Sequence, residues 1–167
     1  MYKRQASASP VVDSAQIDEA ERQLLAPFER PTGENPYTIH SDLQEMLQSL
    51  VGIFRTEDDL QRALGELEKF KVRAALMRVE GSRLFNPGWH LSRDLQHMLV
   101  VAEAVTRSAL ARQESRGAHS RIDFPKTEEA WGKKNHVIAR QGNAMKLSEV
   151  PVREMPDELK QILAEEK

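Results

Sequence analysis

The sequence of 167 residues contains no cysteine. Disulfide bonds, zinc ribbons, iron–sulfur ligation and thiol nucleophiles are therefore excluded for this chain. No apolar run approaches the roughly 20 residues that a membrane-spanning helix requires. The basic start MYKRQASASP has no apolar segment behind it that would indicate a secretory signal, and residues 1–12 are expected to be an unstructured leader. We expect no direct insertion into a membrane.

The balance of charge points away from nucleic acids. The chain carries 24 Lys and Arg residues against 26 Asp and Glu residues, a formal net charge of -2. A nucleic-acid-binding domain would present a basic patch, which this composition does not indicate. No GxxxxGK[ST] or GxGxxG motif occurs either. We therefore expect this chain to bind no nucleic acid and, by itself, no nucleotide or dinucleotide.

The sequence also lacks the usual motifs of catalytic and metal-binding sites. The sequence has no HExxH motif, and its histidines lack the spacing of zinc ligands. These histidines are His40, His90, His97, His119 and His136. Ser115 lies four residues before His119, but no GxSxG motif and no preceding strand supports a serine nucleophile. We predict neither a metal site nor a catalytic residue in this chain.

The strongest pattern in the sequence is helical periodicity. Apolar residues recur at helical spacing in three long segments, residues 36–54, 57–79 and 89–116. Thr56, with Asp59 three residues later, is typical of a capping box at the start of the second segment. We predict an all-α fold, a three-helix up-down-up bundle resembling a spectrin repeat, with a C-terminal β-hairpin-like tail and a short helix.

The segments around the bundle carry weaker patterns. A short helix is predicted over residues 14–28, where Pro27 is expected to end it. Residues 136–152 contain two strand-like runs around Gly142-Asn143, the composition of a hairpin, and residues 155–167 indicate a closing helix. The predicted regions are a leader and linker with a short helix, the bundle, and an extended tail: residues 1–33, 34–120 and 121–167.

A non-periodic polar run follows the third long helix. Within ARQESRGAHSRIDFPKTEEAW, residues 111–131, the candidate functional residues are Glu114, Ser115, Arg116, Gly117, His119 and Arg121. Gly117 is the expected left-handed residue that stops the helix. Arginines in such a run can bind carboxylates or carbonyls bidentately, so we predict interdomain docking rather than catalysis. Arg116, His119 and Arg121 are expected to face a neighbour that this chain does not contain.

Three stretches resemble one enzyme family. SALARQESRGAHSRIDFPKTEEAW (residues 108–131), NPYTIHSDLQEMLQSLVGIFR (residues 35–55) and NPGWHLSRDLQHMLVVAEAV (residues 86–105) are similar to the C-terminal helical domain of the flavoprotein subunit of succinate dehydrogenase and fumarate reductase. The resemblance covers about residues 34–155, and the ESRGAH block is its most specific part. It implies a fragment of an FAD-dependent oxidoreductase that interconverts succinate and fumarate.

In that family, hydride passes between succinate and the flavin, and an arginine transfers the proton. The FAD-linking histidine, the glycine-rich loop and the substrate-binding residues lie in earlier domains without a counterpart here, so no catalytic residue is carried over. The resemblance implies an inactive fragment that binds no FAD and packs on the FAD-binding domain. It implies a complex with an iron–sulfur subunit and a membrane anchor, at the cytoplasmic, inner face of the plasma membrane.

Two alternatives to this interpretation stay open. L-aspartate oxidase also ends in a helical domain with a similar ESRG block, usually with a bulkier residue than Ala118 before the histidine. The second alternative is a stand-alone helical interaction module without catalysis. Such a module would form a compact monomer, whereas a fragment would expose the surface that its missing neighbour covers.

Overall fold

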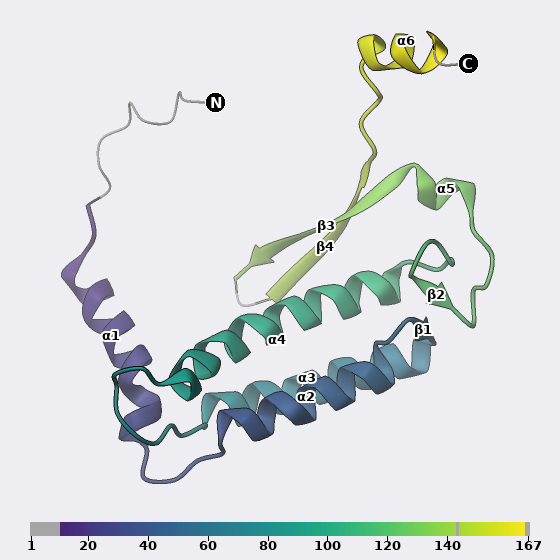
Figure 1. Cartoon of the computed structure of the whole chain (residues 1–167). Helices are drawn as coiled ribbons and strands as arrows, with labels where there is room; N and C mark the ends of the chain where they lie inside the picture. Colours follow the sequence, from purple (N-terminus) through teal and green to yellow (C-terminus); the bar gives the residue numbers. More distant parts are fainter. Residues whose placement is uncertain (1–10, 143, 166–167) are drawn as a thin grey trace. The chain divides into compact units, whose positions relative to one another are not determined.

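The computed structural model describes residues 11–142 and 144–165. The predicted leader, residues 1–12, and the predicted turn at Gly142-Asn143 fall partly outside the described residues. The helices in these ranges are α1 Ser14–Glu29, α2 Pro36–Leu50, α3 Glu57–Ala75, α4 Pro87–Ala111, α5 Glu129–Gly132 and α6 Asp157–Glu165 (Figure 1). The strands are β1 Phe54–Arg55, β2 Ser120–Arg121, β3 Lys134–Gln141 and β4 Ala144–Pro151. Helix predominates, and the hairpin and closing helix are both formed, as predicted.

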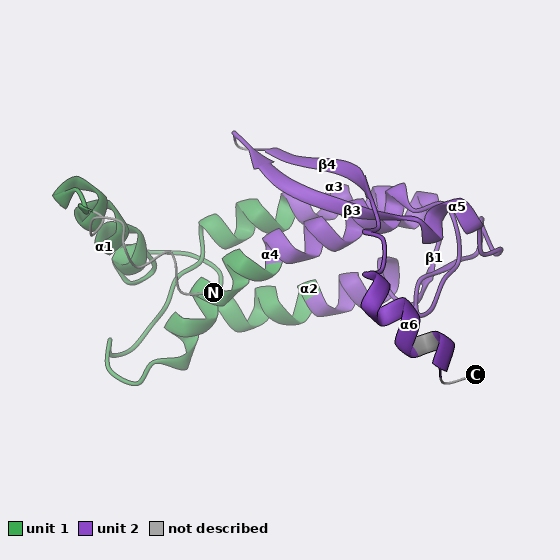
Figure 2. Ribbon diagram, turned by 90° about the horizontal axis from the view of Figure 1, so that it is seen from above, with its two compact units in different colours: residues 1–43, 69–98 green, residues 44–68, 99–167 purple. Residues whose placement is uncertain are grey.

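The chain forms two compact units, each assembled from separate stretches of sequence (Figure 2). The first unit contains the residues up to 43 together with residues 69–98, and the second unit contains residues 44–68 together with those from 99 onward. Helices α2, α3 and α4 each contribute residues to both units. The division into three consecutive regions, 1–33, 34–120 and 121–167, stays a prediction.

In the second unit, the end of α2, the start of α3 and the end of α4 share an apolar core. Leu50, Val51, Leu60, Ala63 and Ala109 pack together there, and none is more than 8% exposed. Because the C-terminal ends of α2 and α4 meet the N-terminal end of α3, successive helices run in opposite directions. This arrangement confirms the predicted up-down-up order.

The first unit combines an apolar layer with a charged cluster. Its buried apolar residues include Ile39, Leu43, Phe70, Ala74, Met77 and Leu95. Arg73 of α3 donates hydrogen bonds to Glu34 at 2.9 Å and to Asp42 of α2 at 2.5 Å. The guanidinium of Arg73 also lies 4.9 Å from the centre of the Phe70 ring. The long aliphatic stem of an arginine can thus cover apolar surface while its head pairs with carboxylates.

Helix α1 begins where predicted but runs through its proline. Asp13 caps it, because its carboxylate accepts a hydrogen bond from the Ala15 N–H at 3.0 Å. Pro27 was expected to end the helix, yet it lies inside the last turn and the helix ends at Glu29. The Pro27 carbonyl accepts a hydrogen bond from the Val79 N–H at 2.9 Å, so a contact far along the chain stabilises this turn.

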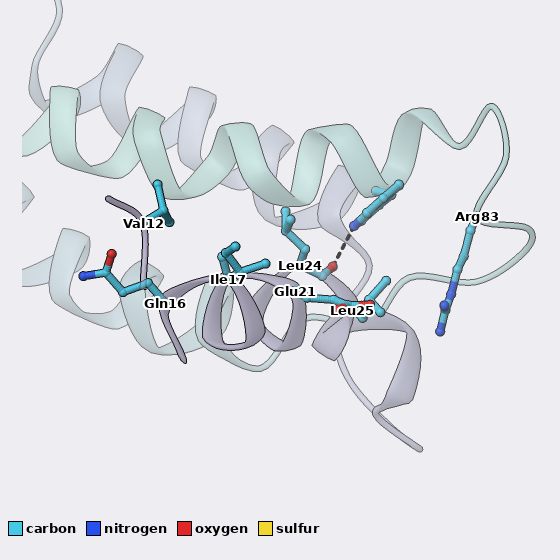
Figure 3. A pocket seen from close by; sticks show the side chains of 9 residues that line it. Val12, Gln16, Ile17, Glu21, Leu24, Leu25 and Arg83 are labelled. Atoms are coloured by element: carbon cyan, nitrogen blue, oxygen red, sulfur yellow. Dashed lines mark hydrogen bonds between the residues drawn. The ribbon is translucent and has the colours of Figure 1, made fainter. Parts of the chain in front are cut away.

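The apolar side of α1 lines an open groove of about 550 Å³ in the first unit (Figure 3). Ile17, Leu24 and Leu25 point into this groove, and Ile17 is still 56% exposed. Trp89, at the start of α4, also lines the groove and donates its indole N–H to the Leu24 carbonyl at 2.8 Å. Trp89 therefore anchors the start of α4 against α1.

The connection between α2 and α3 differs in part from the prediction. The helix was expected to continue to Phe54, but α2 ends at Leu50, and Phe54 is 72% exposed in strand β1. The helix does not continue past Leu50 because residues 54–55 adopt an extended conformation and pair with β2. The N-cap at Thr56 is confirmed: the Thr56 hydroxyl accepts a hydrogen bond from the Asp59 N–H at 3.2 Å and donates to the Asp59 carboxylate at 2.7 Å.

Helix α4 is shorter than predicted. It was expected to reach Arg116 but ends at Ala111, so Gly117 is not the residue that stops it. Gly117 does have a positive φ of 58°, in a tight turn between Arg116 and His119. The backbone groups of these two residues hydrogen-bond to each other at 2.8 and 3.1 Å. The helix ends early because side chains of the following loop bind its last carbonyl groups.

The predicted hairpin is formed by β3 and β4. They pair antiparallel, from Lys134 opposite Pro151 to Gln141 opposite Ala144. Gly142 has a φ of 61°, a left-handed conformation that glycine adopts without strain. Both strands belong to the second unit.

Gly65 and Gly117 offer a matched pair of substitutions. A Cβ atom at either position would meet no atom within 4 Å, but Gly65 lies inside α3 whereas Gly117 has the left-handed φ. We expect Gly65→Ala to raise the free energy of unfolding by about 1 kcal/mol. Gly117→Ala should lower it by about 1 kcal/mol. Urea unfolding followed by circular dichroism measures both, and changes of the same sign would contradict the assignment of their backbone conformations.

Candidate functional site

The polar run after α4 is organised around Arg121, whose side chain has no exposed surface. Its Nη1 donates hydrogen bonds to the last carbonyls of α4 and the residue after it: Ala109 and Leu110, both at 3.1 Å, and Arg112 at 3.3 Å. Its Nε and Nη2 bind the two carboxylate oxygens of Asp123 at 2.8 and 2.7 Å. The guanidinium therefore caps the C-terminal end of α4, where positive charge is favourable.

Glu114 is the second fully buried charge of the run. It accepts hydrogen bonds from Arg112 Nη1 at 2.6 Å, from Arg116 Nε at 2.9 Å and from the Glu128 N–H at 2.9 Å. Burial by itself would raise the pKa of this carboxyl group. The hydrogen bonds from Arg116, the Glu128 amide and Arg112 outweigh burial and lower the pKa of Glu114 to about 2. Glu114 is thus an ionised structural centre, not a proton donor.

Ser115 has a structural role as well. Its Oγ accepts a hydrogen bond from the Arg121 N–H at 2.9 Å and lies 2.9 Å from the Phe124 carbonyl, to which it donates. The Ser115 carbonyl accepts a hydrogen bond from the Thr127 hydroxyl at 2.6 Å. The hydroxyl therefore connects two segments of the loop. Its hydrogen bonds go to backbone groups and not to a general base, as a nucleophile would require.

His119 is bound on both sides of its ring. Arg55 Nη1 lies 2.7 Å from His119 Nδ1, and His119 Nε2 lies 3.1 Å from the Arg112 carbonyl. An arginine can only donate, so Nδ1 is the acceptor and Nε2 carries the proton. Burial lowers the pKa of His119, and the charges of Arg55, Arg121 and Arg112 lower it further, against the effect of the Arg112 carbonyl. The imidazole is consequently neutral and fixed in one tautomer.

The loop is fastened to the start of α3 by strands β1 and β2. These strands pair in parallel, with Phe54 opposite Ser120 and Arg55 opposite Arg121. Asp123 continues the contact, because its carboxylate accepts a hydrogen bond from the Glu57 N–H at 2.9 Å in the first turn of α3. The hydrogen bonds from Arg121 and from Glu57 lower the pKa of Asp123 to about 2, against the opposing effect of burial.

The structure divides the predicted docking residues into two groups. Glu114 and Arg121 are buried and bind groups of this chain, whereas Arg116 and Gly117 are exposed and Ser115 and His119 are partly exposed. The expectation that Arg121 faces a neighbour is therefore wrong, because its guanidinium is hydrogen-bonded to the end of α4 and to Asp123. A docking role for this run stays a prediction.

Sequence reasoning missed three members of the network. Arg55 binds His119 across 64 positions of sequence, and Asp123 neutralises Arg121. Arg112 binds Glu114 and lies 5.4 Å from the centre of the Trp131 ring. The sequence did contain a signal for Arg55, since that residue closes the VGIFR block of the resemblance.

The described residues show few features of a catalytic centre. In residues 11–142 and 144–165, no group of three or more His, Asp or Glu side chains is placed to hold a metal ion. Across the same ranges, no helix has both the length and the apolar character needed to cross a membrane. The charged side chains of the loop bind one another and the backbone, which is the arrangement of a structural network.

Comparisons with known proteins identify chains that are similar to this one. Residues 40–162 match the family described as fumarate reductase flavoprotein C-term. An uncharacterised FAD-dependent oxidoreductase of Methanocaldococcus jannaschii is 39% identical over 97 residues, 58% of this chain and 17% of that protein. The fumarate reductase flavoprotein subunit of Mycobacterium tuberculosis is 34% identical over 122 residues, 72% of this chain and 21% of that subunit. The chain thus spans only about a fifth of the length of these curated relatives.

Among solved structures, a chain of the Sdh1 complex of Mycobacterium smegmatis in its apo form is similar with a TM-score of 0.82 and 42% sequence identity. The match covers 93% of this chain and 27% of that chain. The family match includes the loop built around Arg121. The chain therefore belongs to the family of C-terminal domains of fumarate reductase and succinate dehydrogenase flavoprotein subunits.

Proposed function

We propose that this chain serves as the helical C-terminal domain of an FAD-dependent enzyme that interconverts succinate and fumarate. Its role in that enzyme is to pack against the FAD-binding part of the same subunit. Hydride transfer takes place in parts of the subunit that this chain does not span. The family match over residues 40–162 supports the proposal.

The observation that carries the structural role is the internal neutralisation of the loop. Its two fully buried charges, Glu114 and Arg121, are each bound by groups of this chain. A catalytic acid or base needs a pKa near the working pH and access to a substrate. Glu114 has neither, and Arg121 has no exposed surface.

The residues of this chain do not fit FAD. A dinucleotide is usually held by a parallel sheet with a glycine-rich turn, at the carboxyl ends of its strands. The described strands form only two separate pairs, β1 with β2 and β3 with β4. FAD therefore belongs, in this proposal, to the part of the subunit that this chain does not span.

The family resemblance also suggests the wider assembly. We propose that the complete enzyme includes an iron–sulfur subunit and a membrane anchor. In this assembly the chain lies on the cytoplasmic, inner face of the plasma membrane and makes no membrane insertion of its own. Co-purification from cells that express the chain at its natural level would identify these partners.

A chimera tests the proposed function. Residues 34–167 would replace the matching C-terminal part of the M. tuberculosis fumarate reductase flavoprotein subunit, which is 34% identical over the matched region. We expect the purified chimera to retain flavin and to reduce fumarate, whereas the subunit truncated before this region should lose both. The 167-residue chain by itself should be colourless. A chimera that performs no better than the truncated subunit, or flavin absorbance in the isolated chain, would contradict the proposal.

A further inference from the structure

The second half of α4 has one buried apolar row and a second apolar row that is exposed. Leu99 and Ala102 are buried in the core of the second unit. On the other face, Val100, Val101 and Val105 are 53%, 60% and 46% exposed. A helix that already buries one apolar row does not normally expose a second one, so the exposed row of valines indicates a missing neighbour.

These valines line an open groove of about 590 Å³ within the second unit. Residues of α4 form one side of the groove, and His136 and Ile138 of strand β3 also line it. The remaining lining residues are polar and include Arg55, Arg112 and His119 of the network described above. The groove thus combines an apolar wall with a cationic group of side chains.

Charge in the groove is unbalanced. Among the described residues that line it, none is acidic. The charge of Arg112 is matched by Glu114, but no carboxylate in residues 11–142 or 144–165 pairs with Arg55. The guanidinium of Arg55 binds the carbonyls of Val51 and Gly52, at 3.3 and 2.7 Å, and the neutral ring of His119.

Arg55 is therefore a partly buried cation without a counter-ion. Burial lowers the pKa of Arg55, and no nearby acid compensates for this effect. A charge that has lost part of its hydration is costly unless an opposite charge approaches it. Arg55 thus has polar partners for its N–H groups but no opposite charge beside it.

We propose that this groove receives a segment of the flavoprotein subunit that presents one carboxylate among apolar side chains. The valines of α4 cover the apolar part of that segment, and Arg55 pairs with its carboxylate. The proposal depends on the proposed function, since the segment belongs to the larger part of the subunit that this chain does not span. Charge complementarity selects an acidic segment over a basic or neutral one.

Two glutamate substitutions test the apolar part of the groove. Val101 is 60% exposed in α4 inside the groove, and Val72 is 62% exposed in α3 outside it. In the chimera, Val101→Glu should speed the loss of fumarate-reducing activity at elevated temperature at least about tenfold, because it places a second carboxylate opposite an acidic partner. Val72→Glu should change that rate by less than about twofold.

The isolated chain separates docking from folding. Both valines are exposed, so Val101→Glu and Val72→Glu should leave its melting temperature equally unaffected. If Val101→Glu and Val72→Glu behave alike in a working chimera, the groove proposal is overturned while the proposed function stands. If light scattering shows that the isolated chain dimerises and Val101→Glu abolishes the dimer without effect in the chimera, the occupant is a second copy and the proposal is also overturned.

Arg55→Gln tests the charge. It removes the cation but keeps a group that can bind the nearby carbonyls and His119. We expect Arg55→Gln to speed the loss of fumarate-reducing activity of the chimera at elevated temperature about tenfold at low salt. The unmodified chimera should be inactivated faster as salt is raised, because salt screens the ion pair, whereas the rate of the Arg55→Gln chimera should depend less on salt. An equal salt dependence of the two would show that Arg55 meets no carboxylate.

Discussion

Replacing Arg121 with methionine should lower the free energy of unfolding of the chain by about 3 kcal/mol, because several hydrogen bonds of a buried guanidinium are lost, each worth about 1 kcal/mol. Methionine fills a similar volume but donates no hydrogen bond. It would leave the Asp123 carboxylate without its bidentate partner and the Ala109 and Leu110 carbonyls without a donor. Urea unfolding of the 167-residue chain, followed by circular dichroism, measures the loss.

Two further substitutions make this result specific. Arg121→Lys should lose most of the same stability, because an ammonium group cannot bind both oxygens of Asp123 while it also reaches the end of α4. Arg140 is an exposed arginine on strand β3 that donates to the Gly142 carbonyl at 2.9 Å. Arg140→Met should therefore change stability by less than about 0.5 kcal/mol. Equal losses for Arg121→Met and Arg140→Met would refute the capping role of Arg121.

Glu114→Gln should destabilise the chain by about 3 kcal/mol at neutral pH, because it removes the buried carboxylate that accepts hydrogen bonds from Arg112, Arg116 and the Glu128 amide. This cost should depend on pH. The carboxyl group has a pKa of about 2 in the folded chain against a usual value of 4.5. A lowered folded pKa stabilises the fold above the unfolded pKa, and that stabilisation disappears as pH falls through the folded pKa.

The difference in stability between the wild type and Glu114→Gln should consequently be constant above about pH 5.5 and should shrink between about pH 4.5 and 2. Urea unfolding of both proteins at pH 7, 5, 4 and 3 gives the comparison. Glu158, an exposed carboxylate in α6, provides the control substitution Glu158→Gln. A difference for Glu114→Gln that stays constant down to pH 3 would show that its carboxylate is not held in the charged state by these partners.

The long helices could be predicted because their determinants are local. The apolar stripe of α3 has a period that only a helix places on one face, and Leu60, Ala63 and Leu67 are all buried. The N-cap contact of Thr56 with Asp59 involves neighbours in sequence, so it too could be identified from the sequence. The hairpin followed from two strand-like runs around a glycine.

The ends of α2 and α4 could not be predicted in the same way. Periodicity continues past Leu50 and past Ala111, but both helices stop there. Each end is decided by groups that fold back from elsewhere: residues 54–55 pair with β2, and Arg121 binds carbonyls as many as 12 positions earlier in the sequence. A local pattern contains no information about such contacts.

The polar run shows the same division. The sequence by itself determined that Glu114, Ser115, Arg116, Gly117, His119 and Arg121 form a special segment and that this segment marks the family. Only the tertiary structure decided which of these charges point inward. Arg121 and Glu114 have opposite charges two positions away, but their burial also needs partners farther along the chain: the Ala109 carbonyl for Arg121 and the Glu128 amide for Glu114. Arg55, by contrast, has an unmatched charge in the groove beside α4. Burial of a charge depends on the partners that the fold brings to it, which residue order alone does not specify.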